Sequence, residues 1–148
     1  MGLMRIDYHT GVCFLFSLLM ASGCSNEAQT RSVRVTGVVL AERKPLSGAV
    51  ITFEPMEQTP GPKASTLIMN GRYQIDLAAG LQPGTHRVRI SMLPPEINKR
   101  LDEAIGSQAA SHKKPPVIAT KYDSDSALTA KLSAEQEYQC DFSVEFRH

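Results

Sequence analysis

The stretch STLIMNGRYQIDL, residues 65–77, carries the strongest fold signal in the chain. Its central dipeptide, Asn70 and Gly71, readily takes the two positive φ angles of a type I′ turn, which match the twist of paired strands. After the turn, Tyr73 and Ile75 alternate with polar residues, as in a strand with one buried face. We therefore predict a β-hairpin centred on this dipeptide.

Alternation of apolar and polar residues recurs on both sides of this hairpin. Further strands are expected at residues 33–40, 48–55, 85–92, 117–119, 128–132 and 138–146, with proline or glycine in several of the turns between them. Each strand has one apolar face that only a second sheet can cover. The predicted fold class is therefore all-β, an antiparallel β-sandwich of about seven to eight strands.

The alternation is interrupted over residues 94–116. Ile97, Leu101 and Ile105 have helical spacing there, and Gly106 follows them. This spacing predicts a short amphipathic helix that ends near the glycine. We expect a helical insertion in the sandwich.

The N-terminus has the features of an export signal. Residues 11–20 (GVCFLFSLLM) form an apolar run that suits a signal-peptide core and is too short to span a bilayer as a helix. The next residues, 21–24 (ASGC), resemble the bacterial lipobox, in which small residues precede a cysteine that receives diacylglycerol before cleavage. The resemblance implies a mature chain that begins with a lipidated Cys24, carrying acyl chains such as palmitate.

These features divide the chain into a lipoprotein signal peptide (residues 1–23), a polar tether (24–31) and one β-sandwich domain (32–148). Two or three acyl chains hold a protein stably at a membrane, where one chain holds it only marginally. The expected location is exported and membrane-anchored, facing the periplasm or at the outer membrane. Ser25, in place of an aspartate after the cysteine, favours the outer membrane. The alternative is a plain secretory signal that leaves a freely exported domain.

The cysteines predict no disulfide bond. Cys13 leaves with the signal peptide, so Cys140 has no partner once Cys24 is acylated. Cys140 shares the parity of Tyr138 and Phe142 in an alternating strand. This pattern predicts a core position rather than a reactive thiol.

No motif indicates catalysis, a cofactor or a metal site. The chain lacks a Gly-x-Ser-x-Gly elbow, a phosphate-binding loop and a dinucleotide fingerprint. His86, His112 and His148 are far apart in sequence, and His86 has the parity of a core residue. Asp123 and Asp125 fit a polar turn better than a calcium loop. We predict a protein that is not an enzyme and takes no cofactor.

A net charge of +1, with basic residues scattered along the chain, disfavours nucleic-acid binding. Two classes of partner remain, an envelope protein and a polysaccharide. The chain also lacks tryptophan, which weakens the case for a sugar-stacking platform.

Three stretches carry a family resemblance: VTGVVLAERKPLSGAVITFEP (residues 35–55), GRYQIDL (71–77) and LQPGTHRVRIS (81–91). Together they resemble the transthyretin-like or carboxypeptidase-regulatory-like domain. The later ATKYDSDSALTAKL (119–132) is similar to the ending of small bacterial lipoproteins built on that domain. The resemblance implies a Greek-key, prealbumin-like sandwich with a non-catalytic accessory role. One relative hydrolyses 5-hydroxyisourate and ends in Tyr-Arg-Gly-Ser, whereas this chain ends in Glu-Phe-Arg-His, so that activity is not expected.

The sequence thus predicts a membrane-anchored lipoprotein that acts as a non-catalytic interaction or structural module of the cell envelope. The alternative is a periplasmic small-ligand or polysaccharide-binding protein. Any specialised binding is expected at the loop ends and at the insertion over residues 94–116.

Overall fold

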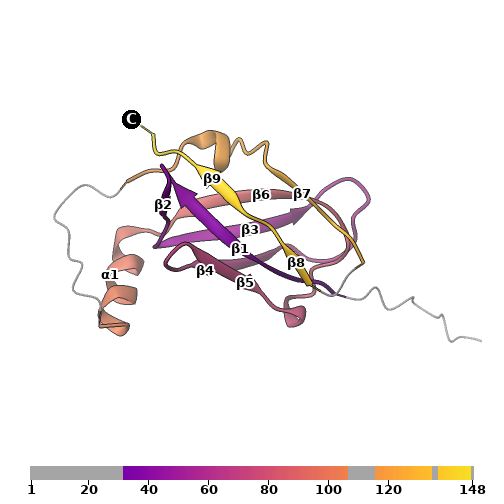
Figure 1. Ribbon diagram of the computed structural model, residues 1–148, viewed down its shortest axis with the longest axis horizontal. Helices are drawn as coiled ribbons and strands as arrows, with labels where there is room; N and C mark the ends of the chain where they lie inside the picture. The colour runs from indigo at the N-terminus through magenta and orange to yellow at the C-terminus, as the bar shows by residue number, and fades with distance from the viewer. Residues whose placement is uncertain (1–31, 107–115, 135–136, 148) are drawn as a thin grey trace, which may run out of the picture.

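The computed structural model describes residues 32–106, 116–134 and 137–147, and it shows two β-sheets that face each other (Figure 1). The described strands are β1 (Arg34–Ala41), β2 (Lys44–Pro45), β3 (Ala49–Pro55), β4 (Ala64–Ile68), β5 (Arg72–Ile75), β6 (Gly84–Met92), β7 (Thr129–Leu132), β8 (Glu137–Gln139) and β9 (Phe142–Val144). The described helices are η2 (Leu77–Ala79), α1 (Pro95–Ala104) and η3 (Thr120–Tyr122). None of these helices is long and apolar enough to cross a membrane.

β1 is the central strand of the first sheet. β5 and β2 pair with it in antiparallel orientation, whereas β8 and β9 pair with it in parallel orientation. These two parallel pairings depart from the purely antiparallel sandwich that the sequence predicts. Alternation fixes which face of a strand is buried, but it does not fix the direction in which a neighbouring strand runs.

The second sheet has the strand order β4-β3-β6-β7 and is antiparallel throughout. The inward-facing residues of the long strands β3 and β6 lie opposite each other, as in the pairs Ile51 with Ile90 and Phe53 with Val88. All four of these side chains are buried.

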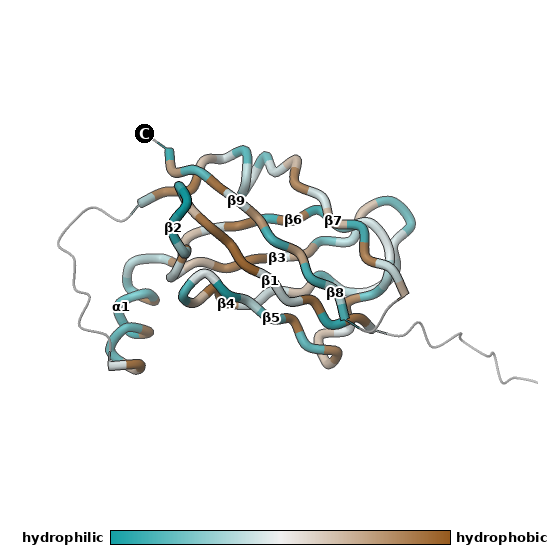
Figure 2. The backbone as a smooth tube through the Cα atoms, in the orientation of Figure 1, coloured by the Kyte–Doolittle hydropathy of each residue, from teal (hydrophilic) through white to brown (hydrophobic). Residues whose placement is uncertain are grey.

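Buried apolar side chains from both sheets form one core, and β1 and β3 carry long apolar stretches through it (Figure 2). The largest fully buried apolar side chains are Phe53, Ile51, Ile68, Leu81, Ile90, Val33, Val35, Val39, Val88 and Val144. This core confirms the predicted mostly-β class with two facing sheets.

The turn at Asn70 and Gly71 forms as predicted, with φ angles of 51° and 74°, but the long hairpin does not. Met69 and Arg72 form a single bridge across the turn. Beyond that bridge, β4 pairs with β3 and β5 pairs with β1. The turn therefore joins the two sheets, and inward-facing side chains of both strands, such as Ile68 of β4 and Tyr73 of β5, are buried in the core.

Residues 42–47 contain a tight hairpin turn between β1 and β2. Glu42 and Arg43 occupy its two central positions with φ angles of 49° and 68°. These are the positive angles of a type I′ turn, here without asparagine or glycine.

The strand predicted over residues 138–146 is split into β8 and β9. The backbone N–H of Cys140 donates to Thr36 O at 2.9 Å, and the N–H of Val38 donates to the Asp141 side-chain oxygen Oδ1 at 2.7 Å. The carboxylate thus replaces a backbone acceptor where the two strands separate. The strand predicted over residues 117–119 is reduced to one bridge, between Ile118 and Phe146.

The helix predicted in the insertion is present as α1, followed by Gly106 at a φ of 67°. No residue of α1 is buried, and Ile97 and Ile105 are 46% and 53% exposed. The helix lies at the end of the domain opposite the start of β1 (Figure 1).

Candidate binding groove

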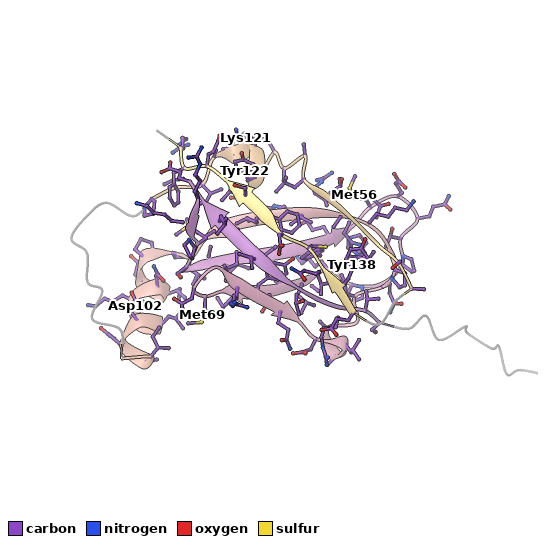
Figure 3. The ribbon with its side chains drawn as sticks, in the orientation of Figure 1. Met56, Met69, Asp102, Lys121, Tyr122 and Tyr138 are labelled. Carbon is purple, nitrogen blue, oxygen red and sulfur yellow. The ribbon has the colours of Figure 1, made fainter. Side chains whose placement is uncertain are left out.

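A groove of about 620 Å³ opens beside β4 and β5. β1, β4, β5 and β8 contribute to its lining, together with Met69, which lies next to the turn that joins β4 to β5 (Figure 3). We call this feature the β4–β5 groove. Its volume falls within the usual range of about 300–1,000 Å³ for ligand sites.

The groove exists because β4 and β5 separate beyond the bridge at their turn. Each is an edge strand, β4 of the second sheet and β5 of the first. Thr66 and Tyr73 have inward parity, whereas Leu67 and Gln74 have outward parity, and all four line the groove. The groove therefore extends from the outer surface of the domain into the space between the edges of β4 and β5.

Two glutamine side chains in the lining are held in place by neighbouring carboxylates. Gln74 Nε2 donates to Asp76 Oδ1 at 2.7 Å, and Gln139 Nε2 donates to Asp141 Oδ2 at 3.2 Å. Asp76 also forms an ion pair with Arg34, at 3.3 Å. Asp76 and Asp141 thus each have a hydrogen-bond partner in the groove lining.

Among the described residues that line the groove, Arg72 is the one that carries a charge. It is exposed, and it has no ion-pair partner within residues 32–106, 116–134 and 137–147. The guanidinium group offers several donors in a planar arrangement that matches a carboxylate. Arg72 therefore gives the groove one cationic group that is available to bind a carboxylate.

A buried tyrosine forms part of the floor of the groove. The Tyr73 hydroxyl donates to Cys140 O at 2.7 Å, and the tyrosine is only 5% exposed. Burial, helped by the neighbouring Cys140 and Asp141, raises the Tyr73 pKa, so the hydroxyl stays protonated. Gly37 lies against the same carbonyl, since a Cβ at this position would be 1.8 Å from Cys140 O.

Cys24, the predicted lipidation site, lies outside the described residues. Cys140 is free and half-buried, and it packs against the core, in line with its predicted position. Burial and the neighbouring Asp141 raise the pKa of the Cys140 thiol to about 11. A thiol that remains protonated at neutral pH is a poor nucleophile.

His86 is completely buried, which confirms the core position predicted from its parity. Its Nδ1 lies 3.3 Å from Gly84 O, whereas Nε2 has no hydrogen-bond partner among the described residues. Burial lowers the His86 pKa, although the contact with Gly84 opposes this shift. The imidazole is therefore neutral, and it packs edge-on against Phe53 at 6.3 Å between ring centres.

Asp123 belongs to a polar turn, as predicted, and takes part in an ion-pair cluster. Arg89 contacts Asp123 at 3.0 Å and Glu54 at 3.2 Å. Hydrogen bonds to these two carboxylates raise the pKa of Arg89. In the described part of the chain, no three histidine, cysteine, aspartate or glutamate side chains are grouped to hold a metal ion.

The sequence predicts specialised binding at the loop ends and at the insertion over residues 94–116, and none of the described residues that line the groove comes from that insertion. The alternation after the turn predicts Arg72 and Gln74 on the solvent-facing side of a hairpin. The signal that points to the groove is the composition of β4, which has no charge, proline or glycine and so resembles an unprotected edge.

In comparisons with known proteins, no family model and no curated protein matches the chain. The resemblance to carboxypeptidase-regulatory-like domains therefore stays a prediction that depends on the stretches quoted for it.

Proposed function

We propose that this protein is a membrane-anchored bacterial lipoprotein whose β-domain acts as a non-catalytic interaction module of the cell envelope. The observation that carries the proposal is the position of the domain relative to Cys24. Within the described part of the chain the first buried core residue is Val33, which follows Cys24 after only eight residues, 25–32. Fully extended, eight residues span about 26–29 Å. A lipid at Cys24 would hold the domain close to the membrane surface.

This attachment suits the arrangement of the domain. The start of β1 lies at one end of the domain, while α1 and the turn between β1 and β2 lie at the opposite end (Figure 1). β4 and β5, which flank the groove, lie between these two ends. A partner could therefore approach the groove from the side of an anchored domain.

Within this proposal, the domain is a prealbumin-like, Greek-key sandwich of the carboxypeptidase-regulatory-like type. Two facing sheets around one core support this assignment, as do the three sequence stretches that resemble the family. Such domains present binding surfaces rather than a common reaction centre, and fold alone does not define function.

The chemistry of the described side chains supports binding rather than catalysis. General acid–base catalysis needs a titratable group that can reach the substrate and has a suitable pKa. His86 is buried and neutral, and the Cys140 thiol has a raised pKa. The groove itself offers one cation among its described lining residues, Arg72, beside hydroxyl, amide and apolar groups.

A freely exported small-ligand or polysaccharide-binding protein is the second candidate function. The volume of the groove favours it. The burial of Tyr73 weighs against a polysaccharide, because a buried ring gives sugars no aromatic surface on which to stack.

Fractionation of cells that produce the wild type or Cys24→Ser tests the proposal. We expect the wild type in the membrane fraction and the variant in the soluble periplasmic fraction. Cys140→Ser is the matched control and should fractionate like the wild type. If Cys24→Ser remains in the membrane fraction to the same extent as the wild type, the proposal is wrong.

A further inference from the structure

Two strand edges with unpaired backbone groups flank the β4–β5 groove. β4 pairs only with β3 among the described strands, and β5 pairs only with β1, apart from the bridge between Met69 and Arg72. An edge strand presents N–H and C=O groups at regular spacing to any extended chain that lies beside it. The groove thus offers the backbone pattern that strand addition uses.

β4 lacks three of the features by which proteins protect an edge. Such features are charged side chains, proline and bulges. The sequence of β4 is Ala-Ser-Thr-Leu-Ile, and Leu67 at its outer side is 39% exposed. Leu67 and Met69 supply an apolar contact for one side chain of an added strand.

The groove also selects by charge. Arg72 has no ion-pair partner among the described residues. Asp76 forms an ion pair with Arg34, and Asp141 accepts hydrogen bonds from Gln139 and the Val38 N–H. An incoming carboxylate therefore meets one available cation and, within the described lining, no competing acidic group. This charge pattern favours an acidic ligand.

We infer that the β4–β5 groove binds an extended peptide segment of another protein, which adds as a strand along the open edge and places an aspartate or glutamate side chain at Arg72. The inference rests on the proposed function as an interaction module and names its partner class. A peptide fits better than a polysaccharide because both edges of the groove offer backbone pairing and Tyr73 offers no exposed ring. A second copy of this chain fits less well, because a two-fold contact through the same surface would bring two Arg72 side chains together.

The probe is a phage-displayed library of random heptapeptides, selected on the full chain extracted in detergent. Enriched peptides are then synthesised with either glutamate or glutamine at the acidic position, and their Kd is measured by calorimetry. We expect the enriched peptides to share one acidic residue within an alternating apolar pattern. The glutamine version should bind roughly tenfold more weakly, which corresponds to the loss of one charge-assisted contact.

Two variants locate the binding site. Arg72→Gln should weaken binding of the acidic peptide roughly tenfold and remove the difference between the glutamate and glutamine versions. Leu67→Lys, which puts a charge on the open edge, should reduce binding below detection. Arg87→Gln is the matched control, since Arg87 is an exposed arginine on β6 outside the groove, and its Kd should equal that of the wild type. Thermal unfolding verifies that each variant is folded. If Leu67→Lys does not fold, the binding result for Arg72→Gln decides alone.

Hydrogen exchange distinguishes strand addition from a contact made by side chains alone. Bound peptide should slow exchange of backbone amides in β4 or β5, and leave those of β7 unchanged. The inference is overturned if no peptide is enriched, if Arg72→Gln binds as tightly as the wild type, or if the groove is instead occupied by a second copy in a dimer. All binding measurements are repeated on Cys24→Ser, because groove binding does not depend on the lipid. If Cys24 proves not to be lipidated, peptide binding by the groove can still be tested. If the groove binds no peptide, the proposed lipid anchor is not affected.

Discussion

The hydroxyl of Tyr73 donates a 2.7 Å hydrogen bond to the carbonyl oxygen of Cys140. Tyr73 lies on β5 and Cys140 lies between β8 and β9, so this bond joins the two strand systems that flank β1. Gly37 of β1 lies directly beside the bond, because its missing side chain leaves the necessary space. The same tyrosine forms part of the floor of the groove. The contact therefore links the stability of the first sheet to the shape of the candidate binding surface.

Tyr73→Phe removes this hydrogen bond and retains the ring. Because the Cys140 carbonyl would then lose its tyrosine partner in a partly buried site, we expect a loss of about 1–2 kcal/mol in the free energy of unfolding. Urea denaturation measures this loss of stability. Tyr138→Phe, on half-buried Tyr138 of β8, is the control and should cost less than half as much. Equal losses in the two variants would show that the hydrogen bond contributes nothing specific.

Gly37→Ala tests the close approach between β1 and the Cys140 carbonyl. The added Cβ would lie 1.8 Å from that oxygen and 2.9 Å from the Tyr73 ring. Backbone must move to relieve this overlap, so we expect a loss of about 3 kcal/mol in the free energy of unfolding.

Gly106→Ala is the matched control for this substitution. Gly106 has a φ of 67°, and among the described residues no atom would lie within 4 Å of an added Cβ. Only backbone strain of about 1 kcal/mol is therefore expected there. A cost at Gly37 no greater than that at Gly106 would contradict the close approach.

The sequence predicts individual elements well where local chemistry decides them. Asn70 and Gly71 adopt the turn angles that their side chains favour, and Pro95 begins the predicted helix. His86 is buried, as its parity in β6 predicts. Each of these outcomes depends on the residue itself or on the alternation around it.

Local sequence patterns do not predict which strands pair when they are far apart in the chain. The same turn at Asn70 would serve a hairpin or a crossing between sheets, and the choice depends on whether β1 and β3 are available as partners. The split between β8 and β9 depends on Asp141 reaching the N–H of Val38, which is 103 residues away in the chain. The groove follows from that crossing, so it could not be located from local patterns.

The buried imidazole of His86 predicts a dependence of stability on pH. The pKa of His86 is lowered from its ordinary value of 6.5 in the folded chain. Below pH 6.5 the unfolded chain therefore binds a proton that the folded chain does not. The contribution of neutral His86 to the free energy of unfolding is fully present above pH 6.5. It is lost as the pH falls from 6.5 towards the lowered pKa, by at most about 1.4 kcal/mol per pH unit.

Urea denaturation of the wild type and His86→Gln at pH 7.5 and pH 5.5 measures this contribution. Glutamine does not titrate, so the variant should lose less stability between the two pH values than the wild type does. Carboxylates titrate in both proteins, so the difference between the two losses of stability isolates the contribution of His86. Equal losses of stability in the two proteins would contradict the assignment of a buried, neutral imidazole.

The lipid anchor at Cys24 is tested by the intact mass of the protein extracted from membranes. Wild type and Cys24→Ser are purified from the same host and compared by mass spectrometry. We expect a wild-type chain that begins at Cys24 and carries the added mass of diacylglycerol and acyl groups, with no such mass on Cys24→Ser. A wild-type chain that is cleaved near residue 23 but carries no lipid would contradict the anchor and would make this protein a freely exported β-domain.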